Sequence, residues 1–230
     1  MRGGEKMDLE ATIKYSIIDK FSWIERSKLK NKIFSIICND CVAGGIYHRL
    51  GLQYTTPTVG LFFFSEDYIK LLENFKCYIT QPLQFKETSA HSRANELRKN
   101  MSCGPYPIGL LGNDVEIQFL HYKDEAEAAD KWNRRVKRIN FENLFFIYSD
   151  SDAEGVSDEL LLRYQNLPSS FKGWKENKIF FSATPRNFNN IIFVRDYEKA
   201  THVGNSTRNR KYEKYIDIIK WLNGEQDFLK

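Results

Sequence analysis

The sequence predicts an α/β fold, a three-layer, Rossmann-like arrangement in which helices flank a largely parallel sheet. Three observations carry this prediction: almost unbroken apolar runs at 33–38, 59–64 and 144–148, helical patterns after the runs, and polar residues where each run ends. An apolar run of this length is typical of a strand that is covered on both faces. Strands that alternate with helices join into parallel sheets through right-handed crossovers.

The chain of 230 residues is expected to form one α/β domain, 31–230, preceded by an N-terminal helical segment, 1–30, that packs on it. In that segment Ile13, Ile17 and Phe21 recur at helical spacing. A hydrophobic content of 42% and an aromatic content of 14% supply enough apolar side chains for a sizeable core.

The stretch 31–52 is the one around which the domain is organised. Its apolar run is followed by Asn39–Cys41, then by a turn that contains Gly44 and Gly45, and then by a helical pattern that Gly51 ends. In open α/β sheets, ligands bind beyond the carboxyl ends of the strands, where helix N-termini offer N–H groups. The glycine pair therefore indicates either a ligand-binding turn or only a tight one.

The rest of the chain continues the alternation. Ser65 is expected to cap a helix that reaches about Phe75, and Asp124 a long helix from Glu125 to Arg138. The alternation of apolar and polar residues at 115–119 places one face of a strand in the core. The other expected elements are a strand at 77–80, an irregular stretch or short helix at 86–100, a hairpin of strands at 108–111 and 115–120, a helix at 156–166 capped by Ser157, strands at 178–183 and 190–194, and a helix at 208–222.

Charge and composition narrow the classes of partner. A formal net charge of +4 is too mild to predict a nucleic-acid partner, although it is compatible with an anionic ligand. No apolar stretch is long enough to span a bilayer, and the first residues lack the apolar middle of a signal peptide. The sequence therefore predicts a cytoplasmic protein.

Four motifs in order resemble those of a known family: Asn39–Cys41 with Gly44–Gly45, then 57–62, Phe119–Lys123 and Trp132–Asn140. This is an uncharacterised bacterial family whose members are found with exopolysaccharide and capsule biosynthesis genes and are labelled exopolysaccharide biosynthesis proteins or acyltransferases. The match runs from about Lys32 to the C-terminus. The family form of the first motif has Asn in place of Asp40 and often a bulky residue in place of Val42. The resemblance implies a pathway, with an activated sugar or acyl donor and a saccharide acceptor as partners, and no particular reaction.

Asp150 and Asp152 follow a buried strand directly, one residue apart. This placement resembles the acidic pair with which many nucleotide-sugar glycosyltransferases hold a divalent metal. Carboxylate oxygens suit Mg²⁺ or Mn²⁺, so these two residues are the candidate metal ligands, with Asp150 also a candidate catalytic residue. The alternative is a turn at a strand end, where Asp is common for local reasons.

Cys41 and His121 are the candidate nucleophile and base for acyl transfer. A thiol near a helix N-terminus is expected to have a lowered pKa, and His121 stands at the end of another strand. His48 points away from Cys41 on the following helix and is the less suitable partner. The alternatives are a small core cysteine and a buried histidine with a satisfied hydrogen bond.

Candidate substrate-binding residues come from the same motifs. Arg135 lies nearest the apolar stripe of its helix and has the bidentate geometry that suits a phosphate or a sugar acid, whereas the other basic residues of that helix form a solvated face. The full set comprises Asn39, Asp40, Gly44, Gly45, His48, Lys123 and Arg135. Together these features favour a transferase that moves a glycosyl or acyl group from an activated donor. The alternative is a non-catalytic binding or assembly protein of the same pathway.

Overall fold

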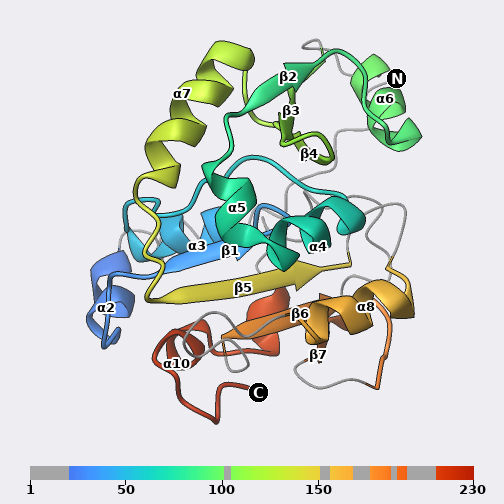
Figure 1. Ribbon diagram of the computed structural model, residues 1–230. Coiled ribbons are helices and arrows are strands. Elements are labelled where there is room, and N and C mark those ends of the chain that lie inside the picture. Colours follow the sequence, from blue (N-terminus) through green and yellow to red (C-terminus); the bar gives the residue numbers. More distant parts are fainter. Residues whose placement is uncertain (1–20, 101–104, 151–155, 168–176, 188–190, 196–210) are drawn as a thin grey trace, which may run out of the picture.

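A mixed α/β architecture with two sheets is seen in the computed structural model, which describes residues 21–100, 105–150, 156–167, 177–187, 191–195 and 211–230 (Figure 1). Sheet A is parallel and has the order β1 (Ser35–Cys38), β5 (Leu144–Ser149), β6 (Lys178–Ser182) and β7 (Ile191–Phe193). Sheet B is antiparallel and has the order β2 (Gln84–Lys86), β3 (Ile108–Leu111) and β4 (Val115–Gln118). The predicted α/β class and largely parallel sheet are confirmed. The Rossmann-like layering stays a prediction.

The described helices are α2 (Ser22–Ser27), α3 (Val42–Leu50), α4 (Ser65–Glu73), α5 (Phe75–Thr80), α6 (Ser92–Lys99), α7 (Glu125–Val136), α8 (Asp158–Gln165) and α10 (Ile218–Leu222), with a 3-10 turn, η2 (Lys211–Lys214). Several begin and end where the sequence predicts. Asp124 accepts a hydrogen bond from the N–H of Glu127 at 2.9 Å, and Ser157 accepts one from that of Leu160 at 3.1 Å. Gly51 ends α3 with a φ of 57°, a conformation that favours glycine.

Sheet A is buried on both of its faces, because alternate residues of each strand belong to different apolar clusters. Ile37 and Phe146 pack with α4, α5 and α8, and also with sheet B through Ile117. Ile36 and Phe145 face the opposite way and pack with α3 and α10. This double burial explains why the strands read as continuous apolar runs.

The predicted strand at 59–64 is wrong, and its residues instead join the two sheets. Phe62 forms a single antiparallel bridge with Gln118 of β4. Phe63 donates its N–H to the carbonyl of Asn39, beyond the end of β1, at 2.9 Å. The segment therefore divides its hydrogen bonds between two neighbours, and a regular ladder with either one does not form.

Side-chain hydroxyl groups form the hydrogen bonds along the edge of β1 that lies beside this segment. Thr58 Oγ1 accepts the N–H of Cys38 at 3.1 Å, and Ser35 Oγ donates to the carbonyl of Thr55 at 2.5 Å. Thr55 Oγ1 donates to the carbonyl of Phe34, and Tyr47 Oη accepts the N–H of Ile36 at 3.1 Å. Side chains thus replace the strand partner that the edge would otherwise need.

Other sequence predictions need correction. The stretch 77–80 is part of α5 and not a strand, because Phe75 and Ile79 lie one helical turn apart and are both buried. The stretch 86–100 contains the end of β2 as well as α6, and the predicted helix at 208–222 is divided between η2 and α10.

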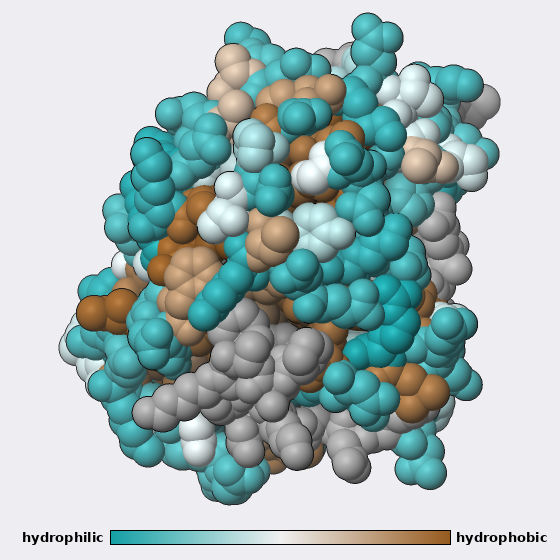
Figure 2. Space-filling model, in the orientation of Figure 1, coloured by the Kyte–Doolittle hydropathy of each residue, from teal (hydrophilic) through white to brown (hydrophobic). Residues whose placement is uncertain are grey.

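Only the end of the N-terminal segment lies in the described part of the chain, so the packing of the whole segment on the domain stays a prediction. Residues 1–20 lie outside the described part of the chain, and α2 buries none of its residues. Phe21 is 50% exposed and Trp23 60% exposed, and Figure 2 shows hydrophobic side chains at the left edge of the molecule, over α2. Arg26 attaches α2 by donating to the carbonyls of Leu50 and Gly51 at 3.2 and 2.8 Å. Among the residues that the structure describes, none of the helices has the length and apolarity required to cross a bilayer.

Candidate functional site

The carboxyl ends of β1 and β5 meet at one edge of sheet A, as the sequence predicts for two of its motifs. Cys38 pairs with Ile147, so Asn39 follows β1 at the level at which Ser149 ends β5. The side chain of Asn39 donates to the carbonyl of Ser149 at 2.8 Å and accepts the N–H of Ser149 at 2.9 Å. Asn39 is 2% exposed, so its amide holds the sheet edge together, and a contact with substrate stays a prediction.

Asp40 places its own carboxylate at the start of α3. Its Oδ1 accepts the N–H of Val42 at 2.9 Å and the thiol of Cys38 at the same distance, and the residue is fully buried. A negative charge is favoured at a helix N-terminus. Because Asp40 supplies that charge, the start of α3 is less suited to a phosphate than the sequence indicates.

Gly44 and Gly45 lie within α3 and not in a turn before it. A Cβ on Gly44 would approach Cγ1 of Val59 to 3.1 Å, so this glycine allows close packing of α3 on the neighbouring segment. A Cβ on Gly45 would meet nothing within 4 Å. His48, farther along α3, is exposed.

Cys41 is the N-cap residue of α3 and is half-buried. Burial and, after it, the Asp40 carboxylate raise the pKa of its thiol, a backbone N–H of Gly60 opposes both, and the net result is a pKa of about 12. The lowered pKa that its position predicts is therefore wrong. The helix N-terminus is outweighed by desolvation and by the neighbouring negative charge.

Gly60 connects Cys41 to His121. The N–H of His121 donates to the carbonyl of Gly60 at 2.9 Å, and a Cβ on Gly60 would lie 3.4 Å from Cβ of His121. His121 itself is exposed, so it is not the buried histidine that the sequence offered as the alternative. The structure thus brings Cys41 and His121 to opposite sides of one glycine.

Arg135 points inward from α7, as expected, and is 9% exposed. Its guanidinium donates to Oη of Tyr122 at 2.6 Å and to the carbonyl of Val59 at 3.2 Å, and it lies 5.1 Å from the ring centroid of Tyr54. These contacts position the Val59–Gly60 segment beneath His121. Lys123 is exposed, and its N–H donates to Glu127 at 2.7 Å.

Asp150 follows β5 and contacts the end of β6. Its carboxylate accepts a hydrogen bond from Oγ of Ser182 at 2.7 Å and from the N–H of Ala183 at 2.8 Å. Burial raises its pKa above the ordinary value, although these hydrogen bonds and Arg186 act in the opposite direction. Asp152 lies outside the described residues, and within them no group of three His, Cys, Asp or Glu side chains could hold a metal ion.

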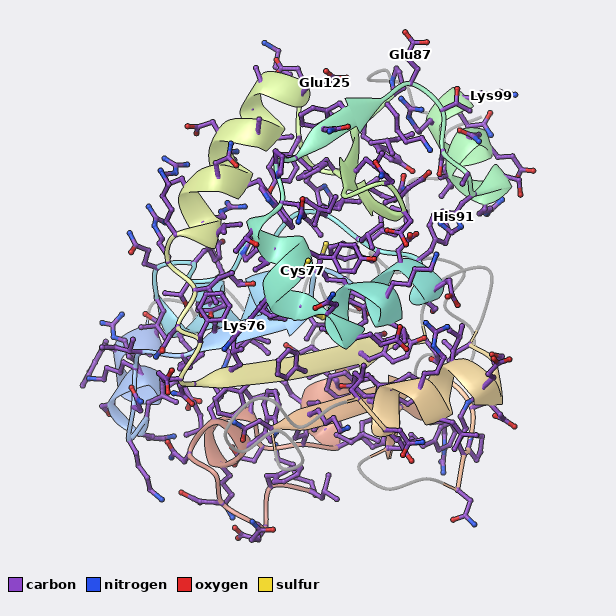
Figure 3. The ribbon with its side chains drawn as sticks, viewed as in Figure 1. Lys76, Cys77, Glu87, His91, Lys99 and Glu125 are labelled. Atoms are coloured by element: carbon purple, nitrogen blue, oxygen red, sulfur yellow. The ribbon has the colours of Figure 1, made fainter. Side chains whose placement is uncertain are left out.

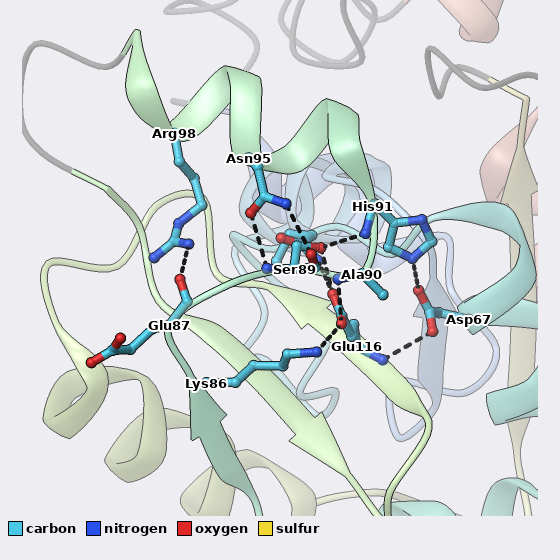
Figure 4. Close-up of polar contacts among 10 residues, drawn as sticks. Asp67, Lys86, Glu87, Ser89, Ala90, His91, Asn95, Arg98 and Glu116 are labelled. Atoms are coloured by element: carbon cyan, nitrogen blue, oxygen red, sulfur yellow. Dashed lines mark hydrogen bonds and ion pairs between the residues drawn. The ribbon is translucent and has the colours of Figure 1, made fainter.

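A second polar cluster was not recognised in the sequence (Figure 4). Nε2 of His91 lies 2.6 Å from a carboxylate oxygen of Asp67, and the other oxygen of Asp67 accepts the N–H of Glu116 at 3.0 Å. The Glu116 carboxylate in turn contacts Lys86 and Ser89, each at 2.5 Å. Figure 3 shows His91 beneath α6, on the side toward α4. Lys86, Ser89 and His91 are near neighbours in the sequence, whereas Asp67 and Glu116 come from α4 and β4, and only the polar positions of β4 indicated the cluster.

A hollow of about 480 Å³ lies at the other end of α3. Arg49 lines it and pairs with Glu25 and Glu213, at 2.6 and 2.7 Å. Because Cys41 precedes α3 and Arg49 lies in its last turn, the hollow is roughly 12 Å along the helix from the thiol. The charged groups that line this hollow neutralise one another. The hollow is also separate from the carboxyl edge of sheet A at which β1 and β5 end.

Two comparisons place the chain among known proteins. Residues 12–223 match the model of a family described as a domain of unknown function, DUF1919. A protein of Haemophilus influenzae whose name is given as uncharacterized protein is 32% identical over 202 residues, which cover 85% of this chain and 87% of that protein.

Proposed function

Since this chain belongs to the DUF1919 family, whose description names no activity, we propose from the site itself that the protein is a transferase that moves an acyl or glycosyl group from an activated donor to a hydroxyl group. The observation that carries the proposal is the position of His121, exposed on one side of Gly60 while the Cys41 thiol lies on the other. His121 follows β4 of the antiparallel sheet B, and its main-chain pairing with Gly60 brings it toward the carboxyl end of β1, where an exposed imidazole is suited to general-base catalysis.

The state of Cys41 favours a direct displacement over a covalent one. A thiol whose pKa is about 12 gives up its proton reluctantly. His121 would therefore act on the acceptor: it takes the hydroxyl proton while the oxygen forms a bond to the donor carbon. The bond from that carbon to its leaving group breaks, and the leaving group departs with the electron pair.

The biological setting is also a proposal. The sequence resemblance supports surface-polysaccharide assembly, in which the acceptor is a saccharide and the donor an activated sugar or acyl group. The described cysteines, Cys38, Cys41 and Cys77, are free thiols, which suits a reducing compartment such as the cytoplasm. We also propose a Rossmann-like layering of helices on sheet A, supported by the apolar clusters on its two faces.

The metal-dependent form of glycosyl transfer has less support. Each carboxylate oxygen of Asp150 already accepts a hydrogen bond from the end of β6. A Mg²⁺ or Mn²⁺ ion on a nucleotide sugar would need further oxygen ligands, and among the described residues Asp150 belongs to no group of three His, Cys, Asp or Glu side chains that could hold it. A single-displacement acyl transfer needs no such ion.

A non-catalytic binding or assembly protein is the second candidate. The observation that favours it is that Asn39, Asp40 and Arg135 are all engaged in internal hydrogen bonds. If the protein only binds a partner, these three residues stabilise the fold, and the exposed His121 is part of the binding surface.

Transfer assays with a His121 variant and a surface control separate the two candidates. Purified protein is incubated with acetyl-CoA or a nucleotide sugar and a panel of saccharides, and products are detected by mass spectrometry. We expect His121→Ala to lower the rate by about 10²- to 10⁴-fold, Asn133→Ala, on the exposed side of α7, to leave it unchanged, and Cys41→Ser to retain most of it. Equal rates for His121→Ala and the unchanged protein would refute the role of His121, and the absence of any product would favour the binding protein.

A further inference from the structure

Sheet B has a polar face that is buried beneath α6. Val115, Ile117 and Phe119 point into the main core, whereas Glu116 and Gln118 point to the other side, where they are 3% and 0% exposed. The pairing of strands places Lys86 and Tyr106 on the same side as Gln118. The prediction that only one face of β4 is buried is therefore wrong.

The Glu116 carboxylate on this face is paired from within it. Glu116 accepts hydrogen bonds from Nζ of Lys86 at 2.5 Å, from Oγ of Ser89 at 2.5 Å and from the N–H of Ala90 at 2.8 Å (Figure 4). Asp67 faces His91 at 2.6 Å. The face consequently offers a polar surface that does not call for a strongly charged ligand.

Two polar atoms on this buried face have no hydrogen-bond partner: Oη of Tyr106 and Oε1 of Gln118. Tyr106 is 2% exposed. Nε2 of Gln118 lies 3.4 Å from the Glu116 carboxylate, and burial raises the pKa of Tyr106 to about 12, with Arg98 acting against this and Glu116 adding to it. A buried acceptor and a buried hydroxyl without partners are costly, and a bound group that supplies hydroxyls would satisfy both.

Aromatic rings border these atoms. The centroids of Phe62 and Phe64 lie 5.3 Å apart, and that of Tyr106 lies 6.3 Å from Phe62. Phe62 also pairs with Gln118 through the main chain. Rings beside hydroxyl-binding side chains are suited to a molecule with an apolar face and a polar rim, as a sugar ring has.

Helix α6 covers this face and is held in place mainly by polar contacts. Ala94 is the only buried residue of α6. Asn95 donates to the carbonyl of Ser89 at 2.8 Å, and Arg98 donates to the carbonyl of Tyr106 at 3.0 Å. An element with few buried apolar contacts opens at low free energy, because water can replace its hydrogen bonds.

We propose that the polar face of sheet B binds a neutral saccharide and that α6 opens to admit it. The role of this saccharide as acceptor rests on the proposed transferase function. Phe62 and Gln118 are paired through the main chain, and a few residues away in the same two segments Gly60 is paired with His121, so a sugar on this face would lie near the proposed base. Binding itself is independent of transfer and is tested without a donor.

The test uses the full chain with methyl glycosides of glucose, galactose and N-acetylglucosamine at millimolar concentration. Hydrogen–deuterium exchange is measured for the amides of α6, and saturation-transfer NMR for the sugars. We expect at least one glycoside to slow exchange across 92–99 by about tenfold, and Tyr106→Phe to weaken its binding by about tenfold. Because the hydroxyl of Tyr106 has no partner in the protein, this variant should remain folded. Tyr78→Phe, which removes an exposed hydroxyl, should bind as the unchanged protein does.

Two results would overturn the proposal. One is that none of the glycosides alters exchange in α6. The other is that Tyr106→Phe and Gln118→Met bind sugar as tightly as Tyr78→Phe, which would indicate water as the partner of these atoms. Sugar binding without any transfer product would leave this site intact and refute only the proposed function.

Discussion

The side-chain amide of Asn39 binds the main chain of Ser149 in both directions, donating to its carbonyl at 2.8 Å and accepting its N–H at 2.9 Å. The main-chain carbonyl of Asn39 accepts the N–H of Phe63 at 2.9 Å. One residue therefore connects the end of β1 to the end of β5 on one side and to the segment leading toward sheet B on the other. Only an amide side chain provides one donor and one acceptor in this geometry.

We expect Asn39→Asp to lower the free energy of unfolding by about 2–4 kcal/mol, because a carboxylate cannot donate to the carbonyl of Ser149 and would bury a negative charge beside it. Urea unfolding followed by circular dichroism measures the change. Asn113→Asp, in the exposed turn of the β3–β4 hairpin, is the matched control and should leave the midpoint unchanged. An equal midpoint for both variants would show that the amide does not hold the sheet edge.

Glu116 gives a prediction that depends on pH. Burial raises its pKa, but hydrogen bonds from Lys86, Ser89 and Ala90 outweigh burial, so the pKa lies below the ordinary value of 4.5. A carboxyl group whose pKa is lowered by folding stabilises the fold above its unfolded pKa, and this contribution is lost as the pH falls through the folded pKa. Glu116→Gln should therefore cost about 1–3 kcal/mol at neutral pH and progressively less below pH 4.5.

Chemical unfolding at a series of pH values tests this prediction. Glu96→Gln removes a carboxylate from the exposed side of α6 and serves as the control. A cost for Glu116→Gln that stays constant from neutral to acidic pH would mean that the ionised form is not what stabilises the face.

Cysteine labelling should follow exposure and pKa and not position at a helix N-terminus. Cys77 is exposed on α5 (Figure 3), Cys41 is half-buried with a pKa raised to about 12, and Cys38 is buried. We expect iodoacetamide to modify Cys77 first, Cys41 far more slowly and Cys38 last, with the rate at Cys41 still rising above pH 9. Mass spectrometry of tryptic peptides resolves the three sites. Labelling of Cys41 ahead of Cys77 at neutral pH would restore the covalent acyl-transfer mechanism.

The sequence predicts sheet A well because a strand that is buried on both faces appears in the sequence as a continuous apolar run. Leu144–Ser149 is apolar almost throughout and is a strand of that sheet. The run at 59–64 is equally apolar, yet its hydrogen bonds go to Asn39 and Gln118, which are distant in the sequence. Periodicity reports burial, and it carries no information on which distant group a main-chain N–H will meet.

The candidate site was predicted less well for the same reason. The sequence made Cys41 and His121 candidates because both follow predicted strands, although β1 and β4 belong to different sheets and the catalytic roles stay predictions. The pKa of Cys41 could not be predicted, since it depends on burial and on the direction of the Asp40 carboxylate. Asp67, His91 and Glu116 come from three separate elements, and a pattern within any one of them is that of an ordinary surface helix or half-exposed strand.

Gly60→Ala should disrupt the relation between Cys41 and His121. Gly60 has a φ of 76°, and a Cβ there would lie 3.3 Å from the ring of Tyr122 and 3.4 Å from Cβ of His121. Left-handed backbone strain and crowding together should cost about 1–2 kcal/mol and displace the His121 side chain. The imidazole signals in an NMR spectrum and the thermal midpoint should both move. A shift in midpoint with unchanged His121 signals would mean that the glycine serves the backbone alone.

Gly45→Ala should separate stability from function. Gly45 lies inside α3, and a Cβ there meets nothing within 4 Å, so alanine should raise the free energy of unfolding by up to about 1 kcal/mol. Gly44→Ala is the matched control, because its Cβ would approach Val59 to 3.1 Å and should cancel the gain in helix propensity. If the bare surface of α3 at Gly45 is where a donor approaches the backbone, the stabilised variant should bind acetyl-CoA or a nucleotide sugar more weakly than the unchanged protein. Calorimetric titration measures that affinity, and an undiminished affinity in the more stable protein would show that Gly45 does not contact the donor.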